Sequence, residues 1–567
     1  MATAAPLLLA GLGRAPFDDP GEGQHAEIAR ELARSGDPFR LTLNGVPYVD
    51  KPPLLYALMA AASALGGESE GTARAVPALA ALAAVGATAW LGARLAGGRA
   101  GFLAGLALFT SAGYFAFGRY VRPESLFVAA LAGGFALALT GLAEDRRGHV
   151  VAGLALFGLA ALAKDPLGAL APPLAVGVAL GLAGRARPLG RWLPWPGVVA
   201  CLLLAFGWWA LAEARTPGFV WYTVADNHVL NVLRARQFPD EDVPLSALEF
   251  LTVGLLGAAP WIMAAGAAVW PLARRRAWRD PRELPWVVLA LWAAGVFAAT
   301  LLSGFRLPHY GLPAYFAVAL LAARGWEAHG GRAMVLAHAL LFGALALACT
   351  LGWASDGARF MESVLGTADV AARKSAAAGQ GAPVPSFAEL RPLLGAAALV
   401  LGLGALAMAG CAAALGRLAA RTRVALPTFI VVATMLALLP AVSAALDLVA
   451  AHRAVRGLAL ELGRRAAPGD VVVHEGPIES SGALEWYSGR RPVLVDARRS
   501  VLAFGALRPE AREVFWDETR LGDAWRSGRR VWLLSVRGPE RTVVARLPGA
   551  RLVAASAGRS LWVNEPR

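Results

Sequence analysis

Charged residues are scarce in this 567-residue chain, at 17%, whereas hydrophobic residues make up 57%. Soluble domains carry about 25% charged residues and are about half apolar. The excess of apolar residues must be buried, so we expect a lipid bilayer to surround much of the chain. Cysteine is also rare. Cys201, Cys349 and Cys411 each lie inside an apolar run, which excludes a disulfide framework and a cysteine metal site.

Lysine is almost absent. Only Lys51, Lys164 and Lys374 occur, and arginine supplies the rest of the 54 basic residues. Because a compact ammonium and a planar guanidinium bind differently, Lys51 and Lys164 are candidates for positions that require the ammonium; chance retention is the alternative. The net charge of +14 does not indicate nucleic-acid binding, since the arginines form short clusters between apolar runs and no single basic face.

Apolar runs divide most of the chain into segments long enough to cross a membrane as helices, for which about 17–25 residues are needed. We expect spans at residues 74–95, 100–118, 125–143, 148–163, 167–184, 196–213, 248–272, 284–303, 307–323, 332–353, 389–415 and 424–446. An N-terminal span brings the total to about thirteen. Its apolar stretch before Gly13 is too short to cross, so either this helix is incomplete or the start lies upstream. It lacks the basic region of a signal peptide.

The arginine clusters predict the orientation, because basic residues concentrate in cytoplasmic connections. They fall in alternate connections, at residues 94–99, 146–147, 185–191, 274–282, 324–332 and 417–423. The periplasmic connections are then 13–73, 119–124, 164–166, 214–247, 303–306 and 354–388, together with everything after residue 446. Within the first of these, the short apolar run 52–66 is predicted to be a helix lying in the membrane interface.

After residue 446 the chain no longer contains apolar runs of spanning length. We divide it into a transmembrane domain over residues 1–450, with large periplasmic loops at 13–73 and 214–247, and a periplasmic α/β domain over 451–567. Segments 470–474, 491–496 and 530–536 are predicted to be short buried strands, separated by helical stretches such as 508–515. The tail has neither a nucleophile elbow nor a phosphate loop, which leaves a structural or acceptor-binding role.

Candidate functional residues gather in the connections that are predicted to face the periplasm, or directly beside them. They are Asp18, Asp19, Glu22, His25, Asp50, Lys51, Arg119, Arg122, Glu124, Lys164, Asp165, Asp226, Asn227, His228, Arg234, Arg306, His309 and Tyr310. Ionisable residues near the membrane are costly and often functional. Cations can hold a lipid phosphate and stabilise charge on a departing phosphate, and a carboxylate can accept a proton or steady a cationic anomeric carbon.

Several of these residues also have purely structural readings. The alternatives are a solvated turn for Asp18 and Asp19, interfacial anchoring for Lys51, Arg119 and Arg122, an ordinary loop position for His228, and helix capping for His309. Their joint placement on one side favours a lipid-phosphate site.

Five segments in order resemble the ArnT-like aminoarabinose transferases and the related protein mannosyltransferases of the GT-C class. They are Asp19-Pro-Gly-Glu-Gly-Gln-His-Ala-Glu-Ile-Ala-Arg-Glu-Leu32 with Asp50-Lys-Pro-Pro-Leu-Leu-Tyr56, Arg119-Tyr-Val-Arg-Pro-Glu124, Lys164-Asp-Pro-Leu-Gly168, Asn227-His228, and Arg306-Leu-Pro-His-Tyr-Gly-Leu-Pro313. The tail segment 483–496 is also similar to these proteins.

The resemblance implies a GT-C fold with about thirteen spans, two interfacial helices in the first loop and a periplasmic C-terminal domain. It implies inverting transfer of a sugar from a polyprenyl-phosphate donor to an envelope glycolipid, such as lipid A, or to a protein. By motif, the first-loop acid falls on Glu22 or Asp19 and the second on Glu124. Lys51 would contact the donor phosphate, with an arginine of the large loop such as Arg234.

The resemblance further implies that Asp50 and His228 lie close together, where they are candidates for a shared divalent metal ion; no other cofactor is expected. Three positions depart from the family pattern. Gly21-Glu22 stands where Asp-Glu is common, Gln24 replaces a basic residue, and Glu124 replaces an aspartate. A secondary transporter and a ligase-like envelope enzyme are the competing readings. The absence of an internal repeat and the one-sided polar groups disfavour the transporter.

Overall fold

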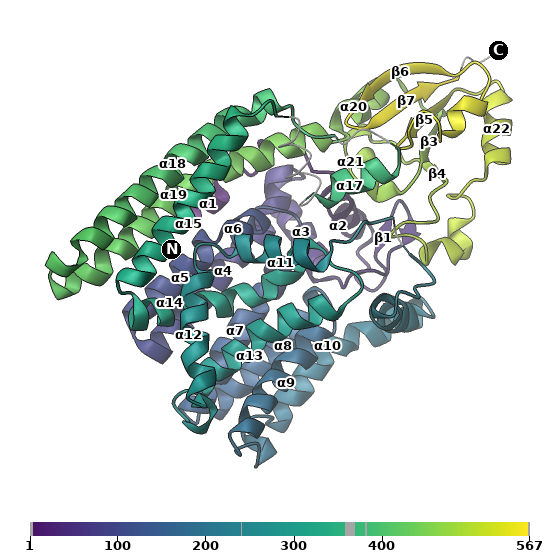
Figure 1. Ribbon diagram of the computed structural model, residues 1–567. Coiled ribbons are helices and arrows are strands. Elements are labelled where there is room, and N and C mark those ends of the chain that lie inside the picture. The colour runs from purple at the N-terminus through teal and green to yellow at the C-terminus, as the bar shows by residue number, and fades with distance from the viewer. Residues whose placement is uncertain (1–3, 240, 358–368, 380–382, 565–567) are drawn as a thin grey trace.

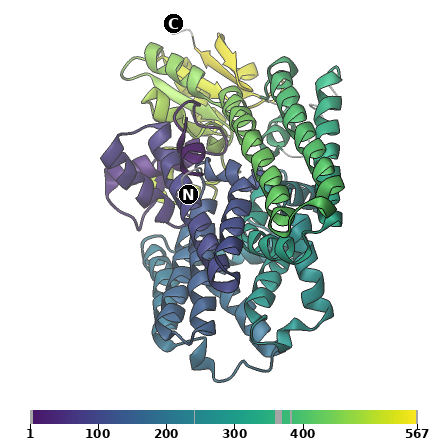
Figure 2. The ribbon, with the colours of Figure 1, turned by 90° about the vertical axis from the view of Figure 1, so that its left-hand side faces the viewer.

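The computed structural model describes residues 4–239, 241–357, 369–379 and 383–564. It is a long helical bundle that carries a small α/β domain at one end (Figure 1). The view turned by 90° shows the C-terminal strands at the top, the N-terminal segment just below them, and the bundle extending downward (Figure 2).

The twelve apolar runs predicted as spans each form a helix or a pair of helices. Seven are single helices long and apolar enough to cross a membrane: α4 (Glu70–Ala96), α7 (Glu124–Ala143), α10 (Trp195–Arg215), α13 (Leu284–Leu302), α15 (Arg332–Ala354), α18 (Phe387–Ala414) and α19 (Ala420–Arg453). Two further runs form bent pairs, which brings the candidate spans among the described residues to nine. This shows a mostly helical, multi-pass membrane protein.

The predicted total of about thirteen includes helices that are shorter than a full span. These are α8 (Arg147–Ala163), α9 (Leu167–Leu182) and α14 (Tyr315–His329), with 17, 16 and 15 residues. At the N-terminus, α1 (Ala4–Leu9) has only six residues within the described chain.

The bends were not predicted. Helices α5 (Gly98–Thr110) and α6 (Ala112–Gly118) meet at 69°, and α11 (Ala247–Gly257) and α12 (Ile262–Arg274) meet at 103°. Pro260 lies in the second break, where it cannot donate a helical hydrogen bond.

The outward face of the bundle is apolar. Phe102, Leu340, Leu406 and Phe429 are large hydrophobic side chains that are all exposed on spanning helices. Side chains of this kind are stable on a surface when lipid covers them. The inward faces contribute a continuous core that joins α4, α5, α7, α8, α14 and their neighbours.

Ion pairs link several of the connections that were predicted to be cytoplasmic. Arg94 pairs with Glu144, and Arg191 Nε lies 3.8 Å from Asp145 Oδ1. A guanidinium nitrogen of Arg324 lies 2.6 Å from Glu283 Oε2. These contacts place the connections at 94–99, 144–147 and 191 together, as expected if they share one side of the membrane.

The first large loop contains two helices, α2 (Gly23–Ser35) and α3 (Leu54–Gly66), separated by a hairpin of β1 (Thr42–Leu43) and β2 (Val46–Pro47). The predicted helix at 52–66 is therefore present. The hairpin turn, Asn44-Gly45, has positive φ at both residues, the conformation that Asn-Gly favours in a two-residue hairpin loop. Almost all of α2 is buried, so it lies beneath other segments and not open at the interface.

The C-terminal domain contains a five-stranded sheet in the order β4-β3-β5-β7-β6. The three predicted strands are present as β3 (Val471–Glu475), β4 (Val493–Val495) and β5 (Val531–Ser535), all parallel. The prediction missed the antiparallel hairpin of β6 (Arg551–Ser556) and β7 (Arg559–Val563). It was also wrong about 508–515, which forms a short 3-10 turn at Pro509–Ala511. The α-helices of this domain are α20 (Arg456–Arg465), α21 (Leu484–Ser488) and α22 (Glu518–Arg526).

The C-terminal domain shares a hydrophobic core with the first loop. Phe17 and Ile28 belong to the same buried cluster as Leu484, Leu494 and Phe504. Since α19 ends at Arg453 and α20 begins at Arg456, the chain passes from bundle to domain with almost no linker. The first loop and the domain therefore form one packed layer above the bundle.

Candidate active site

A cavity of about 1400 Å³ lies where the bundle meets this packed layer. Twelve of the eighteen predicted site residues line it: Asp18, His25, Asp50, Lys51, Arg122, Glu124, Lys164, Asp165, Asn227, His228, His309 and Tyr310. They come from five separate connections of the chain. The convergence that was expected from their distribution along the sequence is therefore present in the fold.

Glu124 lies at the centre of the cationic part of the cavity. It is the first residue of α7 and is almost fully buried. Its Oε1 lies 3.4 Å from both Lys164 Nζ and His309 Nε2, and its Oε2 lies 3.4 Å from Arg122 Nε. The positive ends of two helix dipoles are close by, because α7 begins at Glu124 and α9 begins at Leu167, just after Lys164-Asp165-Pro166. This region has the charge and the backbone dipoles to hold an anion.

Lys51 is the second lysine of the cavity. Its ammonium pairs with the carboxylate of Asp50, whose other oxygen accepts a hydrogen bond of 3.0 Å from the Asn227 side chain. Burial favours the neutral acid, but the charge and the hydrogen bond of Lys51, together with the charge of Arg236, outweigh this effect and hold the pKa of Asp50 below its usual value. The Lys51 side chain remains about one-quarter exposed, so it is accessible to a ligand.

His25 is held neutral at the cavity wall. Its Nδ1 lies 2.9 Å from the Tyr56 hydroxyl. Burial, aided by the positive charge of Arg122, lowers the pKa of His25 to about 3. The imidazole therefore offers hydrogen bonds without adding charge to the site.

Three acids of the first loop have different surroundings, and only one lines the cavity. Asp19 accepts hydrogen bonds from the backbone N–H groups of Val455 and Ala483, at 3.2 and 3.3 Å. Burial raises the pKa of Asp19 to about 7. Glu22 accepts from Arg74 Nε at 2.8 Å and from two backbone N–H groups. Asp18 is the acid of this group that reaches the cavity.

Three of the predicted phosphate-binding arginines do not line the cavity. Arg119 donates to the carbonyl oxygens of residues 7, 8 and 10, each at 2.9 Å, and so caps the end of α1. Arg306 donates to the Leu245 carbonyl at 3.1 Å and to carbonyls at the end of α13. Arg234 lies against Gly304. The guanidinium groups of Arg119 and Arg306 thus serve the local backbone, a use that the sequence pattern could not separate from phosphate binding.

The cavity also contains polar residues that were not predicted to be site residues. Among them are Gln24, Tyr48, Tyr120, Arg236, Asp242, Asp369, Arg453 and Glu479. Arg236 donates to the side chain of Asn227 and lies 3.4 Å from Asp226 Oδ2. It lies in the large loop two residues from Arg234 and, unlike Arg234, lines the cavity, so Arg236 replaces Arg234 as the candidate phosphate-binding arginine of this loop. Its proximity to Asp226-Asn227 in the sequence was the available signal.

The remaining wall of the cavity is apolar. It consists of one face of α9, one face of α13 and a segment of the large loop, namely Leu167, Ala171, Leu174, Ala175, Val178, Val229, Val232, Leu233, Leu291, Trp292, Gly295, Val296 and Ala299. On α9, Leu167 and Leu174 are more than half exposed. The cavity therefore has a polar end at the packed layer and an apolar end between two helices of the bundle.

The expected shared metal site stays a prediction. Asp50 and His228 both line the cavity, but Asp50 has partners on both oxygens, and His228 Nδ1 lies 2.6 Å from the Thr223 carbonyl oxygen. Within the described residues, a group of three possible metal ligands occurs elsewhere, at Glu27, Glu31 and Glu485.

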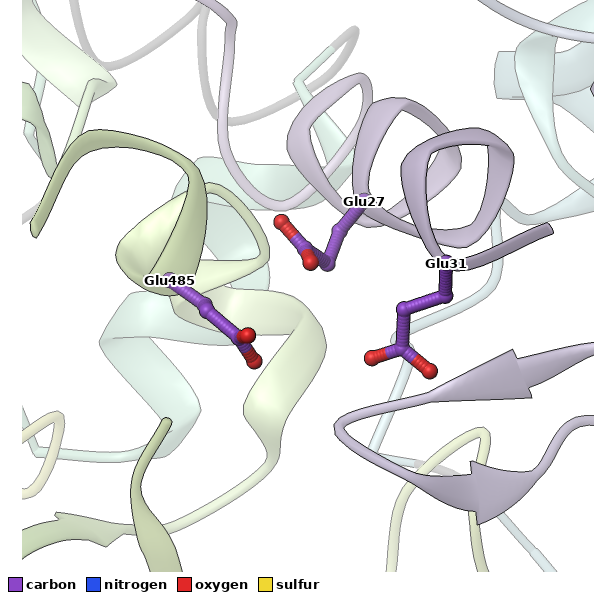
Figure 3. A group of neighbouring side chains, drawn as sticks. All are labelled: Glu27, Glu31 and Glu485. Carbon is purple, nitrogen blue, oxygen red and sulfur yellow. The ribbon is translucent and has the colours of Figure 1, made fainter. Parts of the chain in front are cut away.

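Figure 3 shows this second group, with Glu27 and Glu31 on α2 and Glu485 on α21. Two arginines already pair with its three carboxylates. Arg30 lies 2.6 Å from Glu27, and Arg491 lies 3.0 Å from Glu31 and 2.9 Å from Glu485. The group is therefore an ion-pair network that fastens the C-terminal domain to the first loop.

Comparisons with known proteins agree with the resemblance seen in the sequence. A family model described as dolichyl-phosphate-mannose-protein mannosyltransferase matches residues 50–210. The chain is 29% identical over 335 residues to a protein of Aeromonas salmonicida named undecaprenyl phosphate-alpha-4-amino-4-deoxy-L-arabinose arabinosyl transferase, covering 55% of this chain and 56% of that protein. A protein of the same name from Pseudomonas aeruginosa (strain UCBPP-PA14) is 29% identical over 316 residues, covering 53% and 54%. The alignments thus span about half the length of these relatives.

The likeness in structure covers the whole chain. The crystal structure of ArnT from Cupriavidus metallidurans bound to undecaprenyl phosphate matches with a TM-score of 0.80 at 23% identity, over 100% of this chain and 97% of that one. The apo structure of the same protein matches with the same score at 21% identity. The two chains share their fold from end to end.

Proposed function

Because this chain is ArnT-like in sequence and has the GT-C fold of ArnT, we propose that it is a membrane glycosyltransferase of the bacterial inner membrane. It takes a sugar from a polyprenyl-phosphate carrier at the periplasmic face and transfers it to an envelope glycolipid or protein. The cavity is assigned to the periplasmic face because the arginine-rich connections, which are typical of the cytoplasmic side, lie at the opposite end of the bundle.

The observation that carries the proposal is the two-ended cavity. Its polar end holds Lys51, Arg122 and Lys164, and its apolar end runs between α9 and α13. A polyprenyl phosphate has the same division between an anionic head and a hydrocarbon chain. Cations near the head and apolar side chains along the tail match both parts of one molecule.

The chemistry follows from the polar end. In the transfer, the bond between the anomeric carbon and the phosphate oxygen breaks, and a bond to the acceptor oxygen forms on the opposite face, which inverts the configuration. Negative charge develops on the departing phosphate, where Lys51, Arg122 and Lys164 stabilise it. The carboxylate of Glu124 steadies the positive charge at the anomeric carbon or accepts the proton of a hydroxyl acceptor.

The first donor to test is the one in the relatives' name, undecaprenyl phosphate carrying 4-amino-4-deoxy-L-arabinose. In a lipid nanodisc, the wild-type protein should bind undecaprenyl phosphate and transfer the sugar to a lipid acceptor. Lys51→Gln should weaken carrier binding about 10- to 100-fold, because a hydrogen bond to a charged group contributes roughly 1.5–3 kcal/mol.

Arg520→Gln is the matched control, since Arg520 is an exposed cation that pairs with Glu513 on the surface of the C-terminal domain. This variant should bind the carrier like the wild type. If the wild type fails to bind undecaprenyl phosphate, or if Lys51→Gln and Arg520→Gln bind it equally well, the proposal is wrong.

A further inference from the structure

Lys374 is the third lysine of the chain, and no step of the proposed reaction involves it. It belongs to α17 (Val370–Ala377), a short helix between α15 and α18 that lies beside the C-terminal domain (Figure 1). The first residues of this segment, 369–371, line the cavity. We propose that residues 369–379 form a roof over the transfer site, that Lys374 holds this roof in place, and that the roof keeps water away from the reacting carbon. The proposal rests on the glycosyltransfer function and makes Lys374 a positioning residue that favours transfer over hydrolysis.

The ammonium of Lys374 joins two separate parts of the cavity wall. Its Nζ lies 3.3 Å from Asp242 Oδ1 in the large loop and 3.0 Å from Glu479 Oε1 in the C-terminal domain. Both acids line the cavity. The Lys374 side chain is only 6% exposed and that of Glu479 only 4%, so water screens this pair little. Removing the ammonium leaves buried carboxylate charge without compensation, which is strongly unfavourable.

Two neighbouring side chains fasten the roof to the bundle. Arg373 pairs with Glu249, near the start of α11, and donates to the carbonyl oxygen of Pro244 at 3.1 Å. Asp369, the N-cap of α17, pairs with Arg453 at the end of α19. The roof is therefore attached to the large loop side of the cavity and to the last membrane helix.

The C-terminal end of the roof is attached to the C-terminal domain. Arg541 donates to the carbonyl oxygen of Ala377 at 2.8 Å, and the backbone N–H of Gly538 donates to that of Ala378 at 3.3 Å. A Cβ added at Gly538 would collide with the carbonyl oxygen of Gly379, so the two backbones are in close contact. The segment thus completes the wall of the cavity between the large loop and this domain.

Charged and polar contacts, and no apolar face, hold the roof. The sequence of α17 is Val-Ala-Ala-Arg-Lys-Ser-Ala-Ala, and of its eight residues only Ala372 and Lys374 are buried. A segment with few buried apolar contacts opens at a low cost in free energy. Loss of one charged contact should therefore shift the roof toward an open state without unfolding the bundle.

An open roof matters because water can replace the acceptor in the reaction. In both cases the bond between the anomeric carbon and the phosphate oxygen breaks, and undecaprenyl phosphate leaves. In transfer, an acceptor oxygen forms the new bond to the anomeric carbon. In hydrolysis, a water oxygen forms it, and the products are the free sugar and a proton. Exclusion of water from a closed site suppresses this side reaction.

The experiment measures both reactions of one donor. Nanodisc-embedded protein receives undecaprenyl phosphate carrying 4-amino-4-deoxy-L-arabinose, with and without a lipid acceptor, and the free sugar and the glycosylated acceptor are quantified. Lys374→Met should raise the ratio of hydrolysis to transfer about tenfold, since a lost hydrogen bond to a charged group changes an equilibrium about 10- to 100-fold. Binding of bare undecaprenyl phosphate should stay within about twofold of the wild type, because Lys51, Arg122 and Lys164 are unchanged, and this also shows that the variant is folded.

A second variant and a control complete the design. Arg373→Gln should raise the ratio in the same direction, because it loosens the same helix and leaves Lys374 paired with its buried acids. Arg520→Gln, which changes an exposed cation of the C-terminal domain, should leave the ratio at the wild-type value. Hydrogen exchange gives a readout that needs no donor: the backbone amides of residues 370–379 should exchange faster in Lys374→Met than in the wild type, and those of α18 should not.

The roof is refuted if Lys374→Met and Arg373→Gln both keep the wild-type ratio, or if Arg520→Gln raises it equally. It is also refuted if residues 370–379 exchange at the same rate in Lys374→Met and in the wild type, whichever sugar the enzyme uses. These results leave the proposed lipid-phosphate site intact. A wild type that does not bind undecaprenyl phosphate refutes the proposed function itself, and the proposal for Lys374 with it.

Discussion

Glu22 is the candidate catalytic acid whose surroundings make the sharpest prediction. Its carboxylate accepts hydrogen bonds from Arg74, and from the backbone N–H groups of Asp18 and Val121. Arg74 in turn donates to the carbonyls of Leu12 and Ala15, at 2.8 and 2.7 Å. This pair joins the first loop to α4, and Glu22 does not line the cavity. We therefore expect Glu22→Gln to act on stability first.

The expected size follows from burial. The Glu22 side chain is 1% exposed and that of Arg74 is 7% exposed. Removing one member of a buried ion pair leaves the other charge uncompensated, which costs about 3–5 kcal/mol. We expect the melting temperature of the purified protein to fall by roughly 5–10 °C, while the variant at low temperature still binds undecaprenyl phosphate.

A double variant separates the ion pair from other effects. Glu22→Gln combined with Arg74→Met removes both charges, so its destabilisation should be smaller than the sum of the two single changes. Glu513→Gln, which alters an exposed ion pair, should shift the melting temperature little. The reasoning is refuted if Glu22→Gln unfolds at the wild-type temperature and yet abolishes transfer, since Glu22 would then act in catalysis.

Three other predictions concern residues whose roles the structure separates. Arg122→Gln should weaken binding of undecaprenyl phosphate, whereas Arg119→Gln should lower the melting temperature and leave binding unchanged; the reverse result would contradict the geometry. His25 has a folded pKa of about 3, below its usual value, so the stability it contributes is present above about pH 6.5 and is lost as the pH falls. Acidification from pH 7 to pH 5 should therefore destabilise the wild type by roughly 2 kcal/mol more than His25→Gln, and parallel melting curves would refute this. Arg537 binds Glu241 of the large loop through two contacts of 2.9 Å and also pairs with Asp496, so Arg537→Glu should impair stability and transfer, and adding Glu241→Arg should recover part of both; a double variant no better than the single one would exclude the pair.

The sequence allowed a large part of this structure to be predicted. Each of the twelve apolar runs predicted as spans forms a helix or a pair of helices in the described part of the chain, because lipid demands long hydrophobic stretches. The distribution of charges predicted that Lys51, Glu124, Lys164 and His309 would meet. These residues lie at the ends of strongly apolar segments. Because the connections between spans alternate between the two sides of the membrane, residues at these ends could be assigned to one side from the sequence.

The predicted first-loop acids that do not line the cavity have partners far away in the sequence. Glu22 pairs with Arg74, 52 residues later, and Asp19 accepts from Val455 and Ala483, more than 400 residues later. Nothing in the local pattern shows that a loop acid will be covered by the C-terminal domain. For the same reason Glu479 was not predicted to line the cavity, since its position depends on how that domain packs against the bundle.

Photocrosslinking tests the central claim, that one cavity holds a polyprenyl phosphate with its head at the cations and its chain between α9 and α13. A short prenyl phosphate with a photoreactive group at the end of its chain is irradiated with the protein, and the labelled peptides are identified by mass spectrometry. We predict labels within residues 167–178 and 291–299, which undecaprenyl phosphate should compete away. Labels confined to α15, α18 or α19, or labels that do not respond to competition, would contradict the account.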